Sequence, residues 1–352
     1  MTLTTLPFDQ FLDLPDYRGQ RVERFEFHWI NGVTGEIYGT VTPEKGSPPS
    51  LTHTTTSGIK RRLTMNLGVN FTSQVNPITD RILPYMIVGG TTWPLGRYMF
   101  STDTKAISTR GDRGSYTLLD EGFIVDQQIQ SAFAPNDSVT GAVLLLLTGL
   151  PLPGVMIEAS PYPAAGAFNI GQTRGQILDA YATQGDYFPY WFDNTGNFHM
   201  IRTRDPGVEI PDFNYDVGNK ITRDSIALTS DILTAFNKFI VVSNAGEAQG
   251  AALVGTYEVP PSAPHSIANR GFVLSTVFSI QAASQGQVSA AAKNLGIRST
   301  VYERISLETA LDPRHDSYNI IRFRGVNWLE LSWSMELIAG GKMQHTMRKA
   351  YT

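Results

Sequence analysis

Short segments in which apolar and polar residues alternate recur along most of this chain. In residues 21–41, charged or polar positions alternate with aromatic and β-branched ones on either side of the turn NGVTG, which predicts a β-hairpin. Residues 57–69 alternate with period two through Leu63, Met65 and Leu67, which predicts another strand. Apolar runs of strand length, divided by Gly, Pro and Asp, continue from there. Residues 1–128 are therefore predicted to form a first β-barrel or sandwich.

The pattern changes to helical spacing between residues 129 and 204. Asn136, Asp137 and Ser138 supply N-cap candidates before an apolar helix over 139–147, and residues 169–183 carry apolar side chains at helical intervals. The most apolar run, 142–150, is about half the length that a membrane-spanning helix needs, so we expect a buried helix and no stable membrane insertion. Residues 187–198 predict an aromatic hairpin that turns at 194–196. The segment 129–204 is thus predicted to be a small α+β insertion.

Strand patterns return after a connector rich in Pro, Gly and Asp, 205–230, which is also a candidate to complete the first barrel. Residues 231–262 and 311–352 carry strand patterns and are assigned to a second β-barrel. Between them, 263–310 includes an Ala-rich helix over 284–297 and forms a second small insertion. The predicted fold class is β-rich α+β, with two β-barrel domains and two smaller α+β insertion domains.

Composition narrows the possible functions. The chain has 352 residues, of which 41% are hydrophobic and 17% charged, as expected for a globular protein with a real core. Its formal net charge of −4 offers no basic field for a nucleic acid backbone, which argues against sequence-specific DNA binding. The chain has no cysteine, which excludes disulfides, thiolate zinc sites and cysteine nucleophiles. Met1 to Gln10 lack the basic and apolar regions of a Sec-type signal peptide.

Catalytic and cofactor motifs are missing from the sequence. The six histidines, at 28, 53, 199, 265, 315 and 345, are scattered, with no H-E-x-x-H and no i,i+4 pair. The chain has no G-x-S-x-G elbow, no phosphate-binding G-x-x-x-x-G-K-[ST] and no G-x-G-x-x-G. We therefore expect no enzymatic activity, no cofactor and no metal site.

One aromatic hairpin leaves an alternative open. Asp186, Tyr190, Trp191 and Asp193 combine paired carboxylates with aromatic rings, as a carbohydrate-binding or glycoside-cleaving cell-wall protein would need. The stronger interpretation is ordinary turn chemistry, because Asp193 precedes Asn-Thr-Gly and the aromatic residues alternate as in a packed strand. A third and weaker hypothesis is an adhesin or capsid-type jelly roll, against which the two helical insertions argue.

The only run of three basic residues is Lys60-Arg61-Arg62. In a strand, two of these side chains lie on one face and one on the other. A solvated face is the simplest interpretation, and contact with an anionic partner surface is the alternative.

The order of segments resembles the tail hub proteins of bacteriophages, the family of siphophage minor tail proteins and of the baseplate hub of contractile phages. Four stretches carry the resemblance. They are GGTTWPLGRYMFST (89–102), the helix and aromatic hairpin of 168–200, LDPRHDSYNIIRF (311–323) and WLELSWSMELIAGGKMQHTMRKAYT (328–352). The resemblance covers most of the chain.

The resemblance implies two tail-tube-like barrels in each subunit of a homotrimer, which would form a pseudo-sixfold ring under a hexameric tail tube. Its expected partners are the tail tube protein, the distal tail protein, the tape-measure protein and downstream tail-tip proteins, with DNA only as the transiting genome. The expected location is the tail tip of the virion. Candidate contact residues are Lys60, Arg61, Arg62, Trp93, Arg348 and Lys349.

Overall fold

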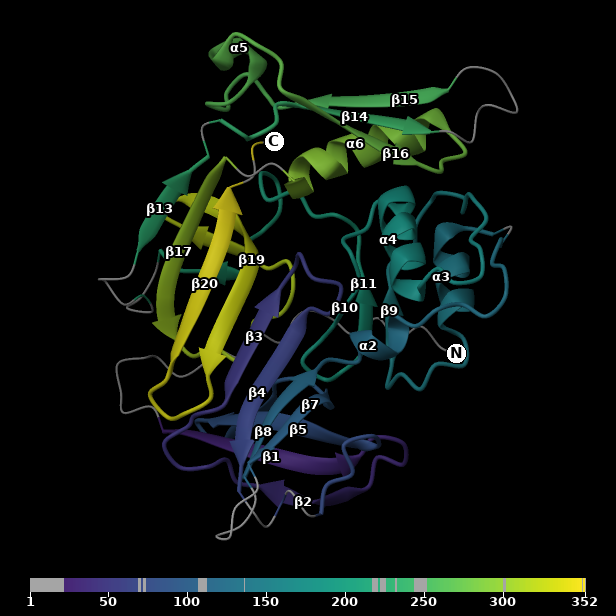
Figure 1. Cartoon of the computed structure of the whole chain (residues 1–352). Helices are drawn as coiled ribbons and strands as arrows, with labels where there is room; N and C mark the ends of the chain where they lie inside the picture. The colour runs from purple at the N-terminus through teal and green to yellow at the C-terminus, as the bar shows by residue number, and fades with distance from the viewer. Residues whose placement is uncertain are drawn as a thin grey trace.

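Strands account for most of the regular structure, as the alternating pattern predicts. The computed structural model describes residues 22–68, 71, 74–106, 113–135, 137–216, 221, 226–231, 233–243, 252–299, 302–349 and 351. Within these ranges, 14 strands join into one large sheet and the others form two three-stranded sheets (Figure 1). The prediction of a β-rich α+β fold is confirmed. Residues 1–21, at the start of the predicted first domain, lie outside the described ranges.

The amino-terminal part of the large sheet, which we call the first unit, is built from the strands between residues 23 and 119. They are β1 (Glu23–Asn31), β2 (Ile37–Val41), β3 (Ser50–Thr54), β4 (Arg61–Leu67), β5 (Asp80–Val88), β6 (Thr91–Pro94), β7 (Tyr98–Ala106) and β8 (Arg113–Leu119). The predicted hairpin of 21–41 is confirmed as β1 and β2. In β4, Leu63, Met65 and Leu67 are buried while Arg62 is exposed, so the alternation does mark the core face.

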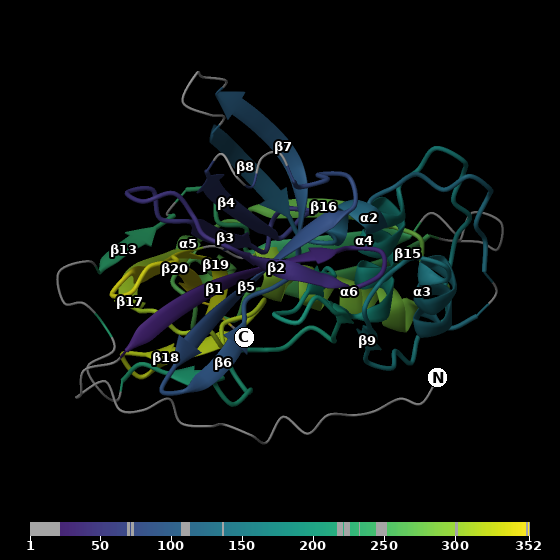
Figure 2. The ribbon, with the colours of Figure 1, turned by 90° about the horizontal axis from the view of Figure 1, so that it is seen from below.

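The strands of the first unit are neighbours in the order β2-β1-β5-β7-β8-β4-β3. The chain after β2 returns to β4, where Pro43 forms a bridge with Leu67 and the Glu44 amide donates to the Asn66 carbonyl at 2.8 Å. Seen from below, the β7–β8 ribbon extends beyond the neighbouring strands (Figure 2).

The second unit of the large sheet comes mostly from the carboxyl-terminal part of the chain. It contains β12 (Phe213–Asn214), β13 (Ala227–Ser230), β17 (Glu303–Ala310), β18 (Ile320–Phe323), β19 (Val326–Glu336) and β20 (Lys342–Lys349). Its own hydrophobic core includes Phe213, Ile305, Ile321, Trp328 and Met347. Strand β13 forms one end of the sheet order and β2 forms the other.

Strand β19 belongs to both units. Its first residues pair with β18, and Ser332 to Glu336 pair with β3 of the first unit. Strand β20 pairs with β19 along both of these parts. The register between β19 and β20 shifts by one residue at Leu331. The Leu331 carbonyl accepts hydrogen bonds from the Thr55 amide (2.8 Å) and hydroxyl (3.0 Å). The two units are therefore joined by continuous strands.

The first insertion forms the predicted helices and aromatic hairpin. It holds α2 (Gly122–Val125), α3 (Val139–Leu147), β9 (Val155–Ile157), α4 (Arg174–Gly185), β10 (Trp191–Phe192) and β11 (Phe198–Met200). The Ser138 side chain caps α3, and Thr173 begins α4 with a capping box to Gln176. Helix α3 is not fully buried as we expected, since Leu144 and Leu145 are 46% and 57% exposed. Among the described residues, no helix is long and apolar enough to cross a membrane.

The second insertion is larger than the predicted 263–310. A separate sheet of β14 (Lys238–Ser243), β15 (Leu253–Glu258) and β16 (Ser275–Ile280) packs against α6 (Gln285–Ser299), with the short α5 (Ile267–Arg270) between β15 and β16. Strands β14 and β15 thus pair with β16 and not with the strands after residue 311. Strand β15 also packs closely on α6 at Gly255, where a Cβ would lie 2.1 Å from the Val288 carbonyl oxygen. Alternation identifies a strand without identifying the sheet that it joins.

Candidate functional site

The hydrophobic cores of the two units meet along one face of the β19–β20 pair. Trp328 and Met347 point into the core of the second unit, and Trp333 points into that of the first. Glu330 and His345 lie between them, since Glu330 pairs with Met347 and His345 pairs with Trp333. A carboxylate and an imidazole therefore occupy the boundary between two apolar cores.

The bulge at Leu331 decides which way Glu330 faces. In a regular strand, Glu330 and Trp333 would point to opposite faces of the sheet, because successive side chains alternate. The extra residue at the bulge places Glu330 on the same face of β19 as Trp333. This is also the face on which His345 of β20 lies. As a result the Glu330 side chain has no exposed surface.

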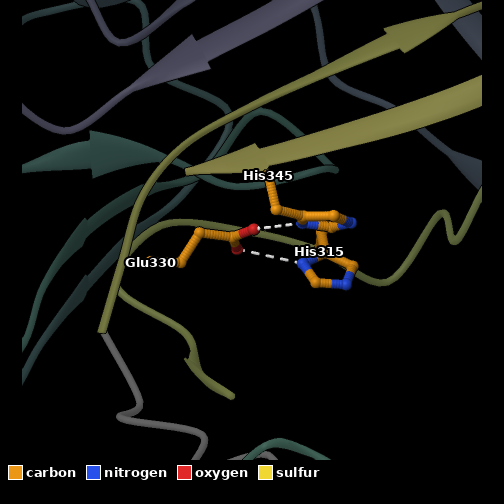
Figure 3. Close-up of side chains that lie close together, drawn as sticks. All are labelled: His315, Glu330 and His345. Atoms are coloured by element: carbon orange, nitrogen blue, oxygen red, sulfur yellow. Dashed lines mark hydrogen bonds and ion pairs between the residues drawn. The ribbon is translucent and has the colours of Figure 1, made fainter. Parts of the chain in front are cut away.

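A third titratable residue, His315, reaches this boundary from the segment 311–319, which links β17 to β18. Its Nδ1 atom lies 2.9 Å from Glu330 Oε2, and His345 Nδ1 lies 2.6 Å from Glu330 Oε1 (Figure 3). Both imidazoles thus approach one carboxylate, each with the same ring nitrogen. We call His315, Glu330 and His345 the buried triad.

The outer nitrogens of the two rings also have partners. His315 Nε2 lies 2.6 Å from the Tyr215 hydroxyl, and His345 Nε2 lies 2.9 Å from Thr309 Oγ1. The His315 ring stacks on Phe213, with centroids 4.0 Å apart and planes 6° from parallel. Packing and hydrogen bonds therefore fix the orientation of the rings.

Burial dominates the electrostatics of the triad. It raises the pKa of Glu330 to about 7, although the hydrogen bond and charge of His345 act in the opposite direction. Burial likewise lowers the pKa of His345, against the attraction of Glu330. Both shifts favour the neutral forms, as expected where few water molecules can solvate a charge.

The hydroxyl of Thr309 constrains where the protons of the triad lie. It lies 2.8 Å from the Ala310 carbonyl, and in donating there it accepts an Nε2 proton from His345. The 2.6 Å contact between His345 Nδ1 and Glu330 Oε1 then requires a further proton or another cation, since two lone pairs would otherwise face each other.

The rest of the segment 311–319 ties three parts of the molecule together. Asp316 Oδ1 accepts from Arg61 of β4 at 2.5 Å, and the Asp316 carbonyl accepts from Trp333 Nε1 at 3.0 Å. Asn194 of the first insertion donates to the carbonyls of Pro313 (3.0 Å) and His315 (3.1 Å). The buried triad therefore lies within the main junction of the fold.

The predicted contact residues divide into internal and surface side chains. Lys60, Arg61 and Arg348 are 6%, 1% and 1% exposed. The ammonium of Lys60 donates to the carbonyls of Thr55 and Ser57, and burial lowers its pKa to about 8. Burial, together with Arg298 and Arg304, lowers the pKa of Arg348 to about 9. These three are structural residues of the chain itself, which corrects the interpretation of 60–62 as a solvated face.

The other three predicted contact residues, Arg62, Trp93 and Lys349, reach the surface, and Lys349 lies 3.4 Å from Glu303.

The residues of the carbohydrate alternative lie near one another in the chain but do not present their rings to solvent. Tyr190 and Trp191 are 3% and 4% exposed, and Trp191 packs in a small cluster with Tyr318. The Asp193 carboxylate accepts hydrogen bonds from Thr195 and His199 within the hairpin turn. Burial raises the pKa of Asp193, but these hydrogen bonds outweigh it and hold the pKa below the usual range. Asp186 ends α4 and pairs with Arg202. The geometry favours the turn interpretation.

Sequence reasoning missed the buried triad. Glu330 lies 15 positions from each histidine, which is too far along the chain for any short metal-binding or catalytic motif. Glutamate inside a strand of otherwise apolar core positions was the one available signal, because charged residues are seldom fully buried without partners.

Comparison with solved structures shows a fold shared with phage tail proteins over nearly the whole chain. A tail protein from Neisseria meningitidis MC58 matches with a TM-score of 0.61 at 10% identity, covering 92% of this chain and 96% of that one. The 43 kDa tail protein of prophage MuSo2 from Shewanella oneidensis gives 0.60 at 12% identity, covering 93% and 98%. The prophage tail protein gp18 from Listeria monocytogenes EGD-e gives 0.61 at 8% identity, covering 93% and 95%.

Sequence comparison adds no closer relationship. No protein-family model matches the chain, and no curated protein matches it either. At 8–12% identity the likeness concerns the fold. The expected structural similarity to phage tail proteins is confirmed, and function has to be argued separately.

Proposed function

We propose that this chain is a structural, non-enzymatic component of a bacteriophage tail, the hub at the tail tip. The observation that carries the proposal is the likeness to three phage tail proteins, each covered over at least 95% of its length. Agreement over whole chains, insertions included, is a stronger argument than one shared barrel. The absence of catalytic motifs from the sequence agrees with a structural role.

The two units are proposed to be the two tube-like barrels of a hub subunit. In the first, the contact of Pro43 with Leu67 would close β2-β1-β5-β7-β8-β4 on itself. In the second, β12-β18-β19-β20-β17-β13 would curve around the core that contains Trp328. The insertions are then 129–204 and a larger second one that includes β14 and β15 with 263–310.

A trimer of such chains would present six similar units in a ring, which suits the hexameric symmetry of a tail tube. The β13 end of the sheet order supports an assembled state. All four residues of β13 are exposed, with Leu228 at 60%. Edge strands left open in this way invite pairing with another chain. In this proposal Arg62, Trp93 and Lys349 contact neighbouring tail proteins, and the ring passes the tape-measure protein and the genome.

Absolute mass in solution tests the proposal. One chain is 38.7 kDa, so light scattering of the chain alone should give about 116 kDa for three copies. If the ring closes only on a tail tube, adding a tail tube protein should give a heavier complex that contains three copies of this chain. Leu228→Glu should reduce the mass to that of one chain, because it places a charge on the open edge strand. Val208→Glu is the matched control, since Val208 is 80% exposed outside any strand. A wild-type mass of 38.7 kDa under both conditions would contradict the proposal.

A further inference from the structure

We propose that the buried triad of His315, Glu330 and His345 is a binding site for a divalent transition metal ion, with Zn²⁺ the best match. Two imidazoles and one carboxylate are a ligand set that zinc takes readily, leaving one position for a water molecule. The three candidate ligand atoms lie within 4.8 Å of one another. The inference concerns residues of a single chain and does not depend on the proposed tail function.

The rings are held as ligands of a metal usually are. Metal-bound histidines commonly use their second ring nitrogen to donate to an oxygen, which orients the ring and makes the first nitrogen a better ligand. Here His345 Nε2 faces Thr309 Oγ1 at 2.9 Å, and His315 Nε2 faces the Tyr215 hydroxyl at 2.6 Å. In both rings Nδ1 is thereby directed at Glu330.

The contact between His345 Nδ1 and Glu330 Oε1 is short enough that a proton or a metal ion must lie between the two atoms. When the Thr309 hydroxyl donates to the Ala310 carbonyl, His345 carries its proton on Nε2 and Nδ1 is free to accept a proton or a metal ion. The Nδ1 atom and the carboxylate oxygen therefore need a proton or a metal between them. Zinc binding would displace that proton, as metal binding to protonated ligands generally does.

The ligand atoms need to move by roughly an ångström or less to surround the ion. Zinc bonds of about 2.0–2.1 Å in a tetrahedral site place ligand atoms roughly 3.3–3.4 Å apart. His315 Nδ1 lies 2.9 Å from Glu330 Oε2 and His345 Nδ1 lies 2.6 Å from Glu330 Oε1, so these distances would grow by roughly 0.4–0.8 Å. Ligand atoms that are now as much as 4.8 Å apart would approach one another. The flanking structure can accommodate this, since Glu330 adjoins a bulge and His315 lies outside the regular strands.

The bound ion would connect three separate parts of the chain. It would hold the segment 311–319 to both β19 and β20, at the boundary of the two hydrophobic cores. The expected role is structural, because a metal that bridges distant segments adds its binding free energy to folding.

Zinc titration of the whole purified chain, first freed of metal by a chelator, tests the inference. We expect one Zn²⁺ per chain by elemental analysis, a rise in melting temperature on adding Zn²⁺, and visible absorption typical of tetrahedral coordination when Co²⁺ replaces it. Glu330→Gln keeps the shape of the side chain and removes the anionic ligand. It should weaken Zn²⁺ binding by at least about 100-fold and abolish the melting-temperature rise.

His53→Gln is the matched control. His53 is also buried and also contacts the segment 311–319, through Ser317 at 2.6 Å, but it lies outside the triad. This variant should bind Zn²⁺ as the wild type does. Should Glu330→Gln fail to fold, His315→Asn provides the second test of the ligand set. Wild-type protein that takes up no Zn²⁺ and shows no Co²⁺ absorption would overturn the inference, as would undiminished binding by the triad variants.

Discussion

Replacing His265 with phenylalanine should remove an acid-sensitive part of the stability of this protein. The imidazole is 1% exposed and stacks on Tyr302, with centroids 4.9 Å apart and planes 10° from parallel. Tyr351 meets it edge-on at 5.3 Å. Neither ring nitrogen has a hydrogen-bond partner among the described residues. The ring is thus held as an aromatic group, an environment that phenylalanine can share.

Burial lowers the pKa of His265 to about 4, and the charge of Arg270 acts in the same direction. In the unfolded chain the pKa is about 6.5. Between these values the unfolded state binds a proton that the folded state does not, so stability is lost as the pH falls from 6.5 toward 4. The full shift corresponds to at most about 3.4 kcal/mol. We expect about half, ~1.5 kcal/mol, because the effective dielectric constant around buried groups in proteins is high enough to reduce the effect.

Urea unfolding at pH 7 and pH 4.5 measures this contribution. The free energy of unfolding of the wild type should fall by about 1.3 kcal/mol more than that of His265→Phe over this interval. All other titrating groups are common to the two proteins and cancel in the difference. A constant difference between the proteins at both pH values would refute the reasoning.

Two further substitutions test the packing. Arg61→Met removes the ion pair with Asp316 at the junction and should cost about 3–5 kcal/mol in chemical denaturation. Arg62→Met, on the exposed face of the same strand, should change the free energy of unfolding by no more than about 0.5 kcal/mol. Equal losses of stability in the two variants would contradict the assignment of Arg61 to the interior. Gly255→Ala places a Cβ against the α6 backbone and should lower stability by about 1–3 kcal/mol in thermal unfolding. Gly286→Ala, where the nearest atom is 3.8 Å away, should be neutral or stabilising, and a larger loss there would show that the Gly255 contact is not limiting.

Much of the fold follows from local patterns. The alternation of Leu63, Met65 and Leu67 identifies both β4 and its buried face, and the Ala-rich run identifies α6. Such patterns cannot choose partners, because a strand with one apolar face satisfies many sheets equally well. The assignment of 231–262 to the second barrel failed for this reason, since the fit of Gly255 to α6 is a long-range contact.

The candidate site could not be predicted from local sequence patterns. His315, Glu330 and His345 meet only because β19 carries a bulge at Leu331 and because the segment 311–319 crosses the junction. A shift of one residue in register would turn Glu330 to the other face of the sheet. The geometry of the triad is therefore a property of strand pairing, which the sequence specifies through the whole fold and not through a motif.

The sharing of β19 between the units also affects how the protein is made. Strand β3, at residues 50–54, pairs with β4 along one edge but finds the partner of its other edge in residues 332–336. The first hydrophobic core also includes Trp333, Met335 and Met343. On the ribosome, the amino-terminal strands emerge long before these residues do. Until then one edge of β3 has no partner strand and part of the core is open, and during this period chaperones or premature association can decide the yield. The first unit is thus early in the sequence and among the last parts of the molecule to finish folding.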